Sequence, residues 1–177
     1  MKKFSKIPKI GTAISRWVMI FLIICCITLT GCDPSPYYFA HDDLEDIVGI
    51  ELIQYDNPEQ KDFFSWVPDH TSDLKPFDNS KVSILETLDE GHISELIDML
   101  CEFHILDTYY AYDSPKGLCL RLTYSSGDFL IVSCDENSYT GYIGKFSLDG
   151  EVVQFIGCFE SWRSFQTLVN DYFQTKI

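Results

Sequence analysis

The chain reads Leu-Cys-Leu-Arg-Leu-Thr-Tyr over residues 118–124, Ser-Ser-Gly-Asp over 125–128 and Phe-Leu-Ile-Val-Ser-Cys over 129–134. In the first segment Leu and Tyr alternate with Cys, Arg and Thr, which is the period of a strand with one buried face. The next four residues are typical of a tight turn, and an apolar strand follows. These 17 residues therefore predict an antiparallel hairpin.

The register of this hairpin depends on its loop. A symmetric loop places Cys119 opposite Cys134, where the two thiols could form a disulfide outside the cytosol. A bulge at Gly127 would shift the register by one residue and separate them. The residues alone leave both registers open.

The remaining elements extend the pattern on both sides of the hairpin. We expect strands over residues 46–55 and 81–88, a second hairpin from 141–147 to 151–157, and amphipathic helices over 93–104 and 162–173. Strands joined by tight turns pair antiparallel. The predicted fold is therefore α+β: an antiparallel sheet of five to six strands, a meander at its C-terminal end, and both helices packed on one face.

The N-terminal 31 residues have the composition of a secretory signal. Five Lys or Arg residues and no acids occupy positions 1–16, and a nearly unbroken apolar run follows over 17–29. This run is shorter than the roughly 20 apolar residues that a membrane-spanning helix needs. We therefore expect residues 1–31 to be a signal peptide.

The apolar run ends in Leu29-Thr30-Gly31-Cys32. This tetrapeptide resembles the lipobox of bacterial lipoproteins, and all four positions match. The resemblance implies cleavage after Gly31 and lipidation of Cys32, so that Cys32 anchors the mature chain to the extracytoplasmic face of the cell membrane. We expect residues 32–45 to form the lipidated tether and residues 46–177 to form one domain.

The mature chain is strongly acidic. The signal peptide carries five of the 13 Lys and Arg residues and none of the 27 acids, so its removal changes the formal charge from −14 to −19. Such a charge repels nucleic acids and anionic headgroups, and no basic cluster remains to reverse it locally. We therefore exclude nucleic acid as a partner.

No motif for catalysis or metal binding stands out in the mature part. The four His residues lie in unrelated contexts, and no HExxH, GxSxG or CxxC pattern occurs. We expect no catalytic residue, no cofactor and no metal. The remaining candidates for binding are aromatic residues in two segments rich in turn formers. Exposed aromatic side chains commonly anchor interfaces. The candidates are Phe63, Phe64, Trp66, Phe77, Tyr109, Tyr110 and Tyr112. The alternative is that these side chains fold back onto the core.

In its order of elements, residues 46–174 resemble small uncharacterised lipoproteins of Gram-positive bacteria, a resemblance that implies no activity. We expect a non-catalytic module that binds a protein, a peptide or an envelope component. Two alternatives stay open: a hydrolase of envelope polymers that uses paired carboxylates, and a structural or immunity-type protein.

Overall fold

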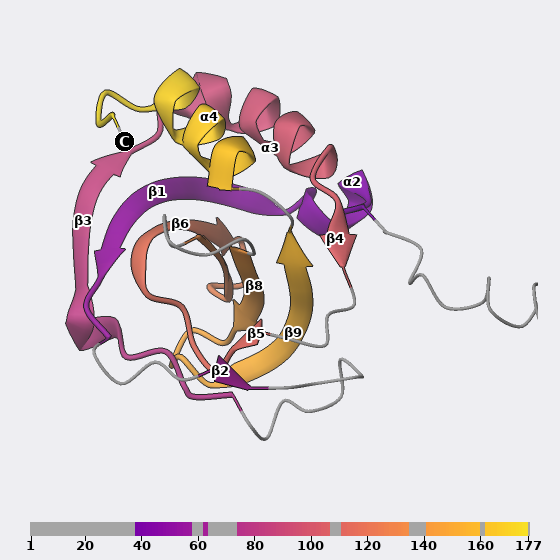
Figure 1. The fold of residues 1–177 in the computed structure, drawn as a ribbon. Helices are drawn as coiled ribbons and strands as arrows, with labels where there is room; N and C mark the ends of the chain where they lie inside the picture. Colours follow the sequence, from indigo (N-terminus) through magenta and orange to yellow (C-terminus); the bar gives the residue numbers. More distant parts are fainter. Residues whose placement is uncertain are drawn as a thin grey trace, which may run out of the picture. The chain divides into compact units, whose positions relative to one another are not determined.

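The expected hairpin lies at the centre of a seven-stranded antiparallel sheet. The computed structural model describes residues 38–57, 62–63, 74–106, 111–134, 141–159 and 162–176, all within the unit Ser35–Ile177. The strand order is β3-β1-β6-β7-β8-β9-β4. The strands are β1 (Ile47–Tyr55), β3 (Val82–Thr87), β4 (Ile105–Leu106), β6 (Gly117–Tyr124), β7 (Phe129–Ser133), β8 (Gly141–Phe146) and β9 (Val152–Phe159). Figure 1 shows that the sheet curls strongly on itself.

The central hairpin adopts the bulged register. Gly127 has a φ of 92°, and its N–H donates to the Tyr124 carbonyl at 2.9 Å. Cys119 consequently pairs with Ser133 rather than with Cys134. Cys119 belongs to one buried cluster and Cys134 to another, so the two side chains point to opposite faces of the sheet. The disulfide that we considered between them is therefore wrong for this structure, in which both residues are thiols.

The helices α3 (Ile93–Cys101) and α4 (Trp162–Tyr172) cover one face of the sheet and lie side by side in Figure 1. Leu96 and Leu100 of α3 pack into the same buried cluster as Phe165 and Leu168 of α4. The i, i+4 and i, i+3 spacings of these pairs place each on one side of its helix. A short helix, α2 (His41–Leu44), joins this layer through the fully buried Leu44.

The other face of the sheet encloses a second buried cluster, rich in aromatic residues. Phe77, in the segment before β3, stacks on Tyr55 with ring centroids 4.3 Å apart and meets Phe129 edge-on at 5.2 Å. Its N–H donates to the Gly150 carbonyl at 2.7 Å. Phe77 is only 2% exposed, so its proposed role in a surface binding patch is wrong, and it is a core residue.

The sequence prediction is confirmed at the level of an antiparallel α+β fold. The expected five to six strands are too few, because the two-residue strand β4 adds an edge beside β9. A separate two-stranded sheet joins β2 (Asp62–Phe63) to β5 (Ala111–Tyr112). Strands of two residues have no periodicity that a sequence pattern could reveal. Residues 38–45, which we expected in the tether, contain α2 and the buried Phe39 and therefore belong to the domain.

Candidate functional site

The structure brings together the two aromatic segments singled out from the sequence. Phe63 in β2 pairs through its backbone with Ala111 in β5, next to Tyr112. The side chains of Phe63 and Tyr112 lie outside the described part of the structure, as do all atoms of Phe64, Trp66, Tyr109 and Tyr110. The expected lipidation site, Cys32, also lies outside the described residues.

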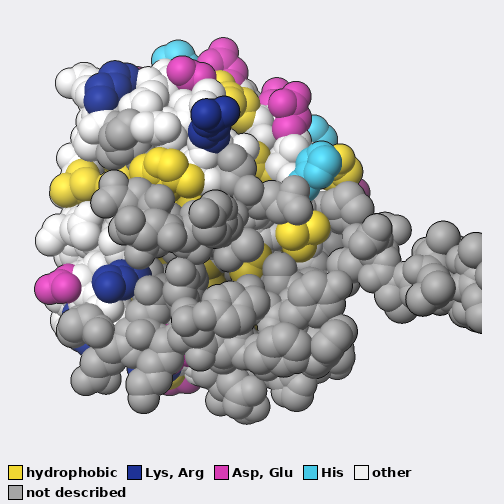
Figure 2. All heavy atoms as spheres, in the orientation of Figure 1, with side chains coloured by type: hydrophobic (Ala, Val, Ile, Leu, Met, Phe, Trp, Pro, Cys, Tyr) yellow, Lys and Arg dark blue, Asp and Glu magenta, His cyan; other side chains and the backbone are white. Residues whose placement is uncertain are grey.

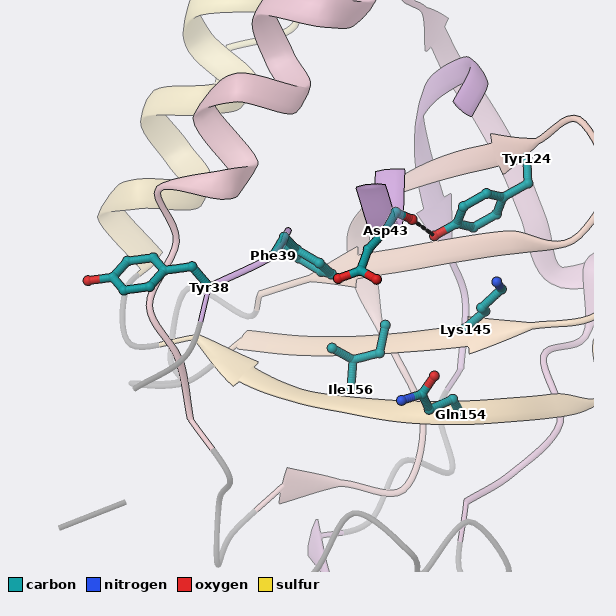
Figure 3. Close-up of a pocket in the computed structure, with 7 residues that line it drawn as sticks. All are labelled: Tyr38, Phe39, Asp43, Tyr124, Lys145, Gln154 and Ile156. Atoms are coloured by element: carbon teal, nitrogen blue, oxygen red, sulfur yellow. Dashed lines mark hydrogen bonds between the residues drawn. The ribbon is translucent and has the colours of Figure 1, made fainter. Parts of the chain in front are cut away.

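A cavity of about 160 Å³ lies where the start of the domain meets the sheet. Its walls come from the residues just before α2, from α2 itself, and from strands β6, β8 and β9. Figure 3 shows the seven lining side chains, which are Tyr38, Phe39, Asp43, Tyr124, Lys145, Gln154 and Ile156. We refer to this cavity as the α2 pocket.

Two hydrogen bonds fix Asp43 in the wall of the α2 pocket. Its carboxylate accepts from the Ala40 N–H at 3.2 Å, as in a capping box. Its backbone carbonyl accepts from the Tyr124 hydroxyl at 3.1 Å. Figure 3 shows this hydrogen bond and places the Asp43 carboxylate at the cavity. The short helix is thereby tied to β6, and the carboxylate has a defined position.

Tyr124 also contacts Lys145, the positively charged residue of the α2 pocket. The Lys145 ammonium lies 4.2 Å from the centroid of the Tyr124 ring, within the range of a cation–π interaction. Burial raises the pKa of Tyr124 to about 12, and the nearby carboxylates of Asp43 and Asp128 add to that rise. At neutral pH the Tyr124 hydroxyl therefore stays protonated and keeps its hydrogen bond.

Tyr38 connects the α2 pocket to the end of α3. A hydrogen bond of 2.7 Å joins Tyr38 Oη to His104 Nε2, and the two rings meet edge-on at 4.9 Å. Tyr38 is 48% exposed, whereas its neighbour Phe39 is 6% exposed. The pocket thus has a buried apolar wall at Phe39 and a more exposed rim at Tyr38.

The exposed surface of α2 and α3 carries several acids. Asp42 of α2 and Glu95 and Asp98 of α3 are solvent-exposed, and His41 lies 3.7 Å from the Asp98 carboxylate. Figure 2 shows acidic and histidine side chains over the helical side of the molecule, with Lys or Arg side chains also on this side. This acidic surface, which shares α2 with the pocket, favours the approach of cationic groups and disfavours free anions.

Two other polar places are less suited to a ligand. A hollow of about 280 Å³ between α3 and α4 includes Arg163 and Ser164, but both residues already have interactions. In a buried network, Asn57 Nδ2 donates to Ser114 Oγ at 2.6 Å, and Ser114 Oγ donates to Asp113 Oδ1 at 3.1 Å. Lys75 Nζ lies 3.2 Å from Asp113 Oδ2. These polar atoms satisfy one another, so the network acts as a structural link.

Sequence reasoning missed the residues of the α2 pocket. Asp43, Lys145 and Gln154 come from distant segments, and each is an ordinary surface residue type in its own segment. The one local signal is the pair Asp42 and Asp43, because acids suit the first turn of a helix, and it concerns structure rather than binding.

Within the described ranges, no three His, Cys, Asp or Glu side chains lie close enough to hold a metal ion. No helix in that part of the chain has the length and apolar character needed to cross a membrane. Comparison of the chain with family models, curated proteins and solved structures gave no match.

Proposed function

We propose that this protein is a lipoprotein, anchored through Cys32 to the extracytoplasmic face of the cell membrane, and that it acts as a non-catalytic binding module. The lipobox and the charged, apolar leader support the anchor. The α2 pocket supports the binding role, because it places a carboxylate, an ammonium and an amide around one small cavity. This arrangement is the observation that carries the proposal.

The position of the α2 pocket in the chain fits a role close to the membrane. Six peptide steps separate Cys32 from Tyr38, the first pocket residue. An extended chain spans at most about 3.6 Å per residue, so this segment can reach no further than about 22 Å. A ligand in the pocket would therefore be held near the outer leaflet, where the lipid is attached.

The chemistry of the α2 pocket favours binding over catalysis. Asp43 is the only acid among the described lining residues, so these residues offer no carboxylate pair for glycoside hydrolysis. The Tyr124 phenol, with a pKa of about 12, does not act as a base near neutral pH. What the lining groups can supply is charge, hydrogen bonds and an apolar wall, which are the elements of a recognition site.

The anchor is tested by the Cys32→Ala variant. We expect wild-type protein to partition into the detergent phase and to carry acyl groups on Cys32 by mass spectrometry, and the variant to lose both properties. Cys26→Ala, within the expected signal peptide, is the matched control and should behave as wild type. Equal partitioning of Cys32→Ala and wild type would overturn the anchor.

The binding role is tested by filling the α2 pocket. Protein extracted gently from the membrane should release a small molecule on denaturation, detectable by mass spectrometry. Ile156→Trp blocks the cavity and should remove that molecule. Val153→Trp, on the same strand but 50% exposed and outside the pocket, should retain it. The same small molecules in both variants, or none in wild type, would contradict a ligand site here.

A further inference from the structure

The α2 pocket holds two opposite charges that do not pair with each other. Asp43 and Lys145 both line the cavity, yet no ion pair within 4.0 Å joins them in the described part of the chain. Figure 3 shows Asp43 on α2, on one side of the cavity, and Lys145 on the neighbouring sheet. An arrangement of this kind is complementary to a molecule that carries both charges.

We propose that the α2 pocket binds a small zwitterion, an α-amino acid being the simplest, with its ammonium toward Asp43 and its carboxylate toward Lys145 and Gln154. This inference rests on the proposed binding function and names its ligand class. The ligand completes two charge-assisted hydrogen bonds, which are the stronger kind in proteins. Gln154 adds an amide that can donate to the same carboxylate.

The charges of the protein argue against simpler ligands. A mature chain with a formal charge of −19 repels a free anion, although Lys145 would attract it locally. A simple cation would be drawn to Asp43 but would also meet the Lys145 ammonium in the same cavity. A zwitterion satisfies both groups and adds no net charge to the pocket.

Both binding groups are fixed before a ligand arrives. The Asp43 carboxylate is held by the Ala40 N–H, and the Lys145 ammonium is held over the Tyr124 ring. Neither group needs to give up these contacts to reach a ligand, because a carboxylate and an ammonium each have further hydrogen-bonding positions. Such preorganisation lowers the entropic cost of binding.

The size of the cavity limits the rest of the ligand. Its volume of about 160 Å³ is below the roughly 300 Å³ at which pockets for drug-sized ligands begin. Phe39 and Ile156 provide apolar wall, which suits a short aliphatic side chain. We therefore expect glycine, alanine or valine to fit and an aromatic amino acid to be excluded.

The test is a titration of the membrane-extracted lipoprotein with L-alanine, followed by isothermal titration calorimetry and saturation-transfer NMR. Ethylamine and propionate supply each charge of alanine alone. We expect both to bind at least tenfold more weakly than alanine. Equal affinity for ethylamine and alanine, or no binding of alanine, glycine or valine, would overturn the zwitterion as the ligand class.

Five variants assign the charges to residues. Asp43→Asn and Lys145→Met should each weaken alanine binding at least tenfold, whereas Lys145→Arg should retain most of it. Asp42→Asn and Lys116→Met change exposed residues of the same two types outside the pocket lining, Asp42 beside Asp43 and Lys116 just before β6, and should leave binding unchanged. Thermal unfolding of each variant separates a lost contact from a lost fold. Equal losses in Asp42→Asn and Asp43→Asn would reject the proposed site.

The failure of this inference differs from the failure of the proposed function. If Ile156→Trp removes a co-purified molecule but no amino acid binds, the pocket is a binding site for another class of ligand. If Ile156→Trp removes nothing and no amino acid binds, both the ligand class and the binding role of this pocket are wrong.

Discussion

The Tyr124 hydroxyl donates a 3.1 Å hydrogen bond to the backbone carbonyl of Asp43, which precedes it by 81 residues in the chain. The ring of the same tyrosine carries the Lys145 ammonium. Tyr124 therefore joins the short helix α2 to the sheet and positions both charged groups of the α2 pocket. This one side chain therefore contributes both to the stability of the domain and to the geometry of the pocket.

Two substitutions separate the contributions of the Tyr124 hydroxyl and ring. Tyr124→Phe removes only the hydrogen bond to Asp43 and should lower the free energy of unfolding by about 1 kcal/mol. Tyr124→Leu also removes the cation–π contact with Lys145 and should cost at least a further 0.5 kcal/mol, roughly. Urea denaturation of the purified protein measures both. If Tyr124→Phe were as stable as wild type, the hydrogen bond would not hold α2 in place.

Gly150 should be far less tolerant of substitution than Gly127, although both have positive φ. An added Cβ at Gly150 would lie 2.0 Å from the Phe77 carbonyl oxygen, whereas at Gly127 its nearest neighbour would be a Leu148 methyl at 3.5 Å. Backbone strain alone should make Gly127→Ala cost about 1 kcal/mol. Gly150→Ala should cost at least about 3 kcal/mol, because the segment that carries Phe77 must move. Similar losses in the two variants would show that Phe77 does not constrain this turn.

Tyr142→Phe should be neutral or should stabilise the protein by up to about 1 kcal/mol. The Tyr142 hydroxyl is buried and has no hydrogen-bond partner among the described residues, so its removal relieves a desolvation cost. Burial also strongly raises the pKa of this phenol.

Tyr55→Phe is the matched comparison, because the Tyr55 hydroxyl accepts from the Asp78 N–H at 3.0 Å. Tyr55→Phe should lower the free energy of unfolding by about 1 kcal/mol. Thermal denaturation of both variants tests the pair, and a clear loss of stability in Tyr142→Phe would mean that its hydroxyl has a partner.

Glu86 should contribute a pH-dependent part of the stability. Its carboxylate accepts from the Gln174 and Thr175 N–H groups and from the Thr175 hydroxyl, and these bonds, that from Gln174 first, hold its pKa below the ordinary value of 4.5. A carboxylate with a lowered pKa stabilises the fold above its unfolded pKa, and the effect is lost as the pH falls through the folded pKa.

Glu86→Gln should therefore be less stable than wild type at pH 6 by no more than about 1 kcal/mol, since the carboxylate is partly exposed. The difference should shrink toward zero between pH 5 and pH 3. Urea denaturation across this range measures it, with the exposed Glu90→Gln as control. A difference that stayed constant with pH would show that the charge of Glu86 is not involved.

Local patterns of the sequence predicted most of the sheet and the helices α3 and α4, but not the four-residue helix α2. The alternation in residues 118–124 predicted β6, and the spacing of Leu96 and Leu100 predicted the buried side of α3. These patterns repeat within a few residues of one segment, so they can be recognised without knowing which other segments pack against it. The two-residue strands β2, β4 and β5 were missed because their existence depends on the strands beside them.

The sequence by itself determined the acidic charge and the antiparallel α+β pattern, and it is the source of the proposed leader and lipobox at Cys32, because each is a local or summed property of the chain. Tertiary structure alone placed Phe77 in the core, chose the hairpin register that separates Cys119 from Cys134, and assembled the α2 pocket. Asp43, Tyr124 and Lys145 come from separate segments, and only the curled sheet brings them to one cavity. Long-range packing decides such contacts, and no periodicity within a segment encodes it.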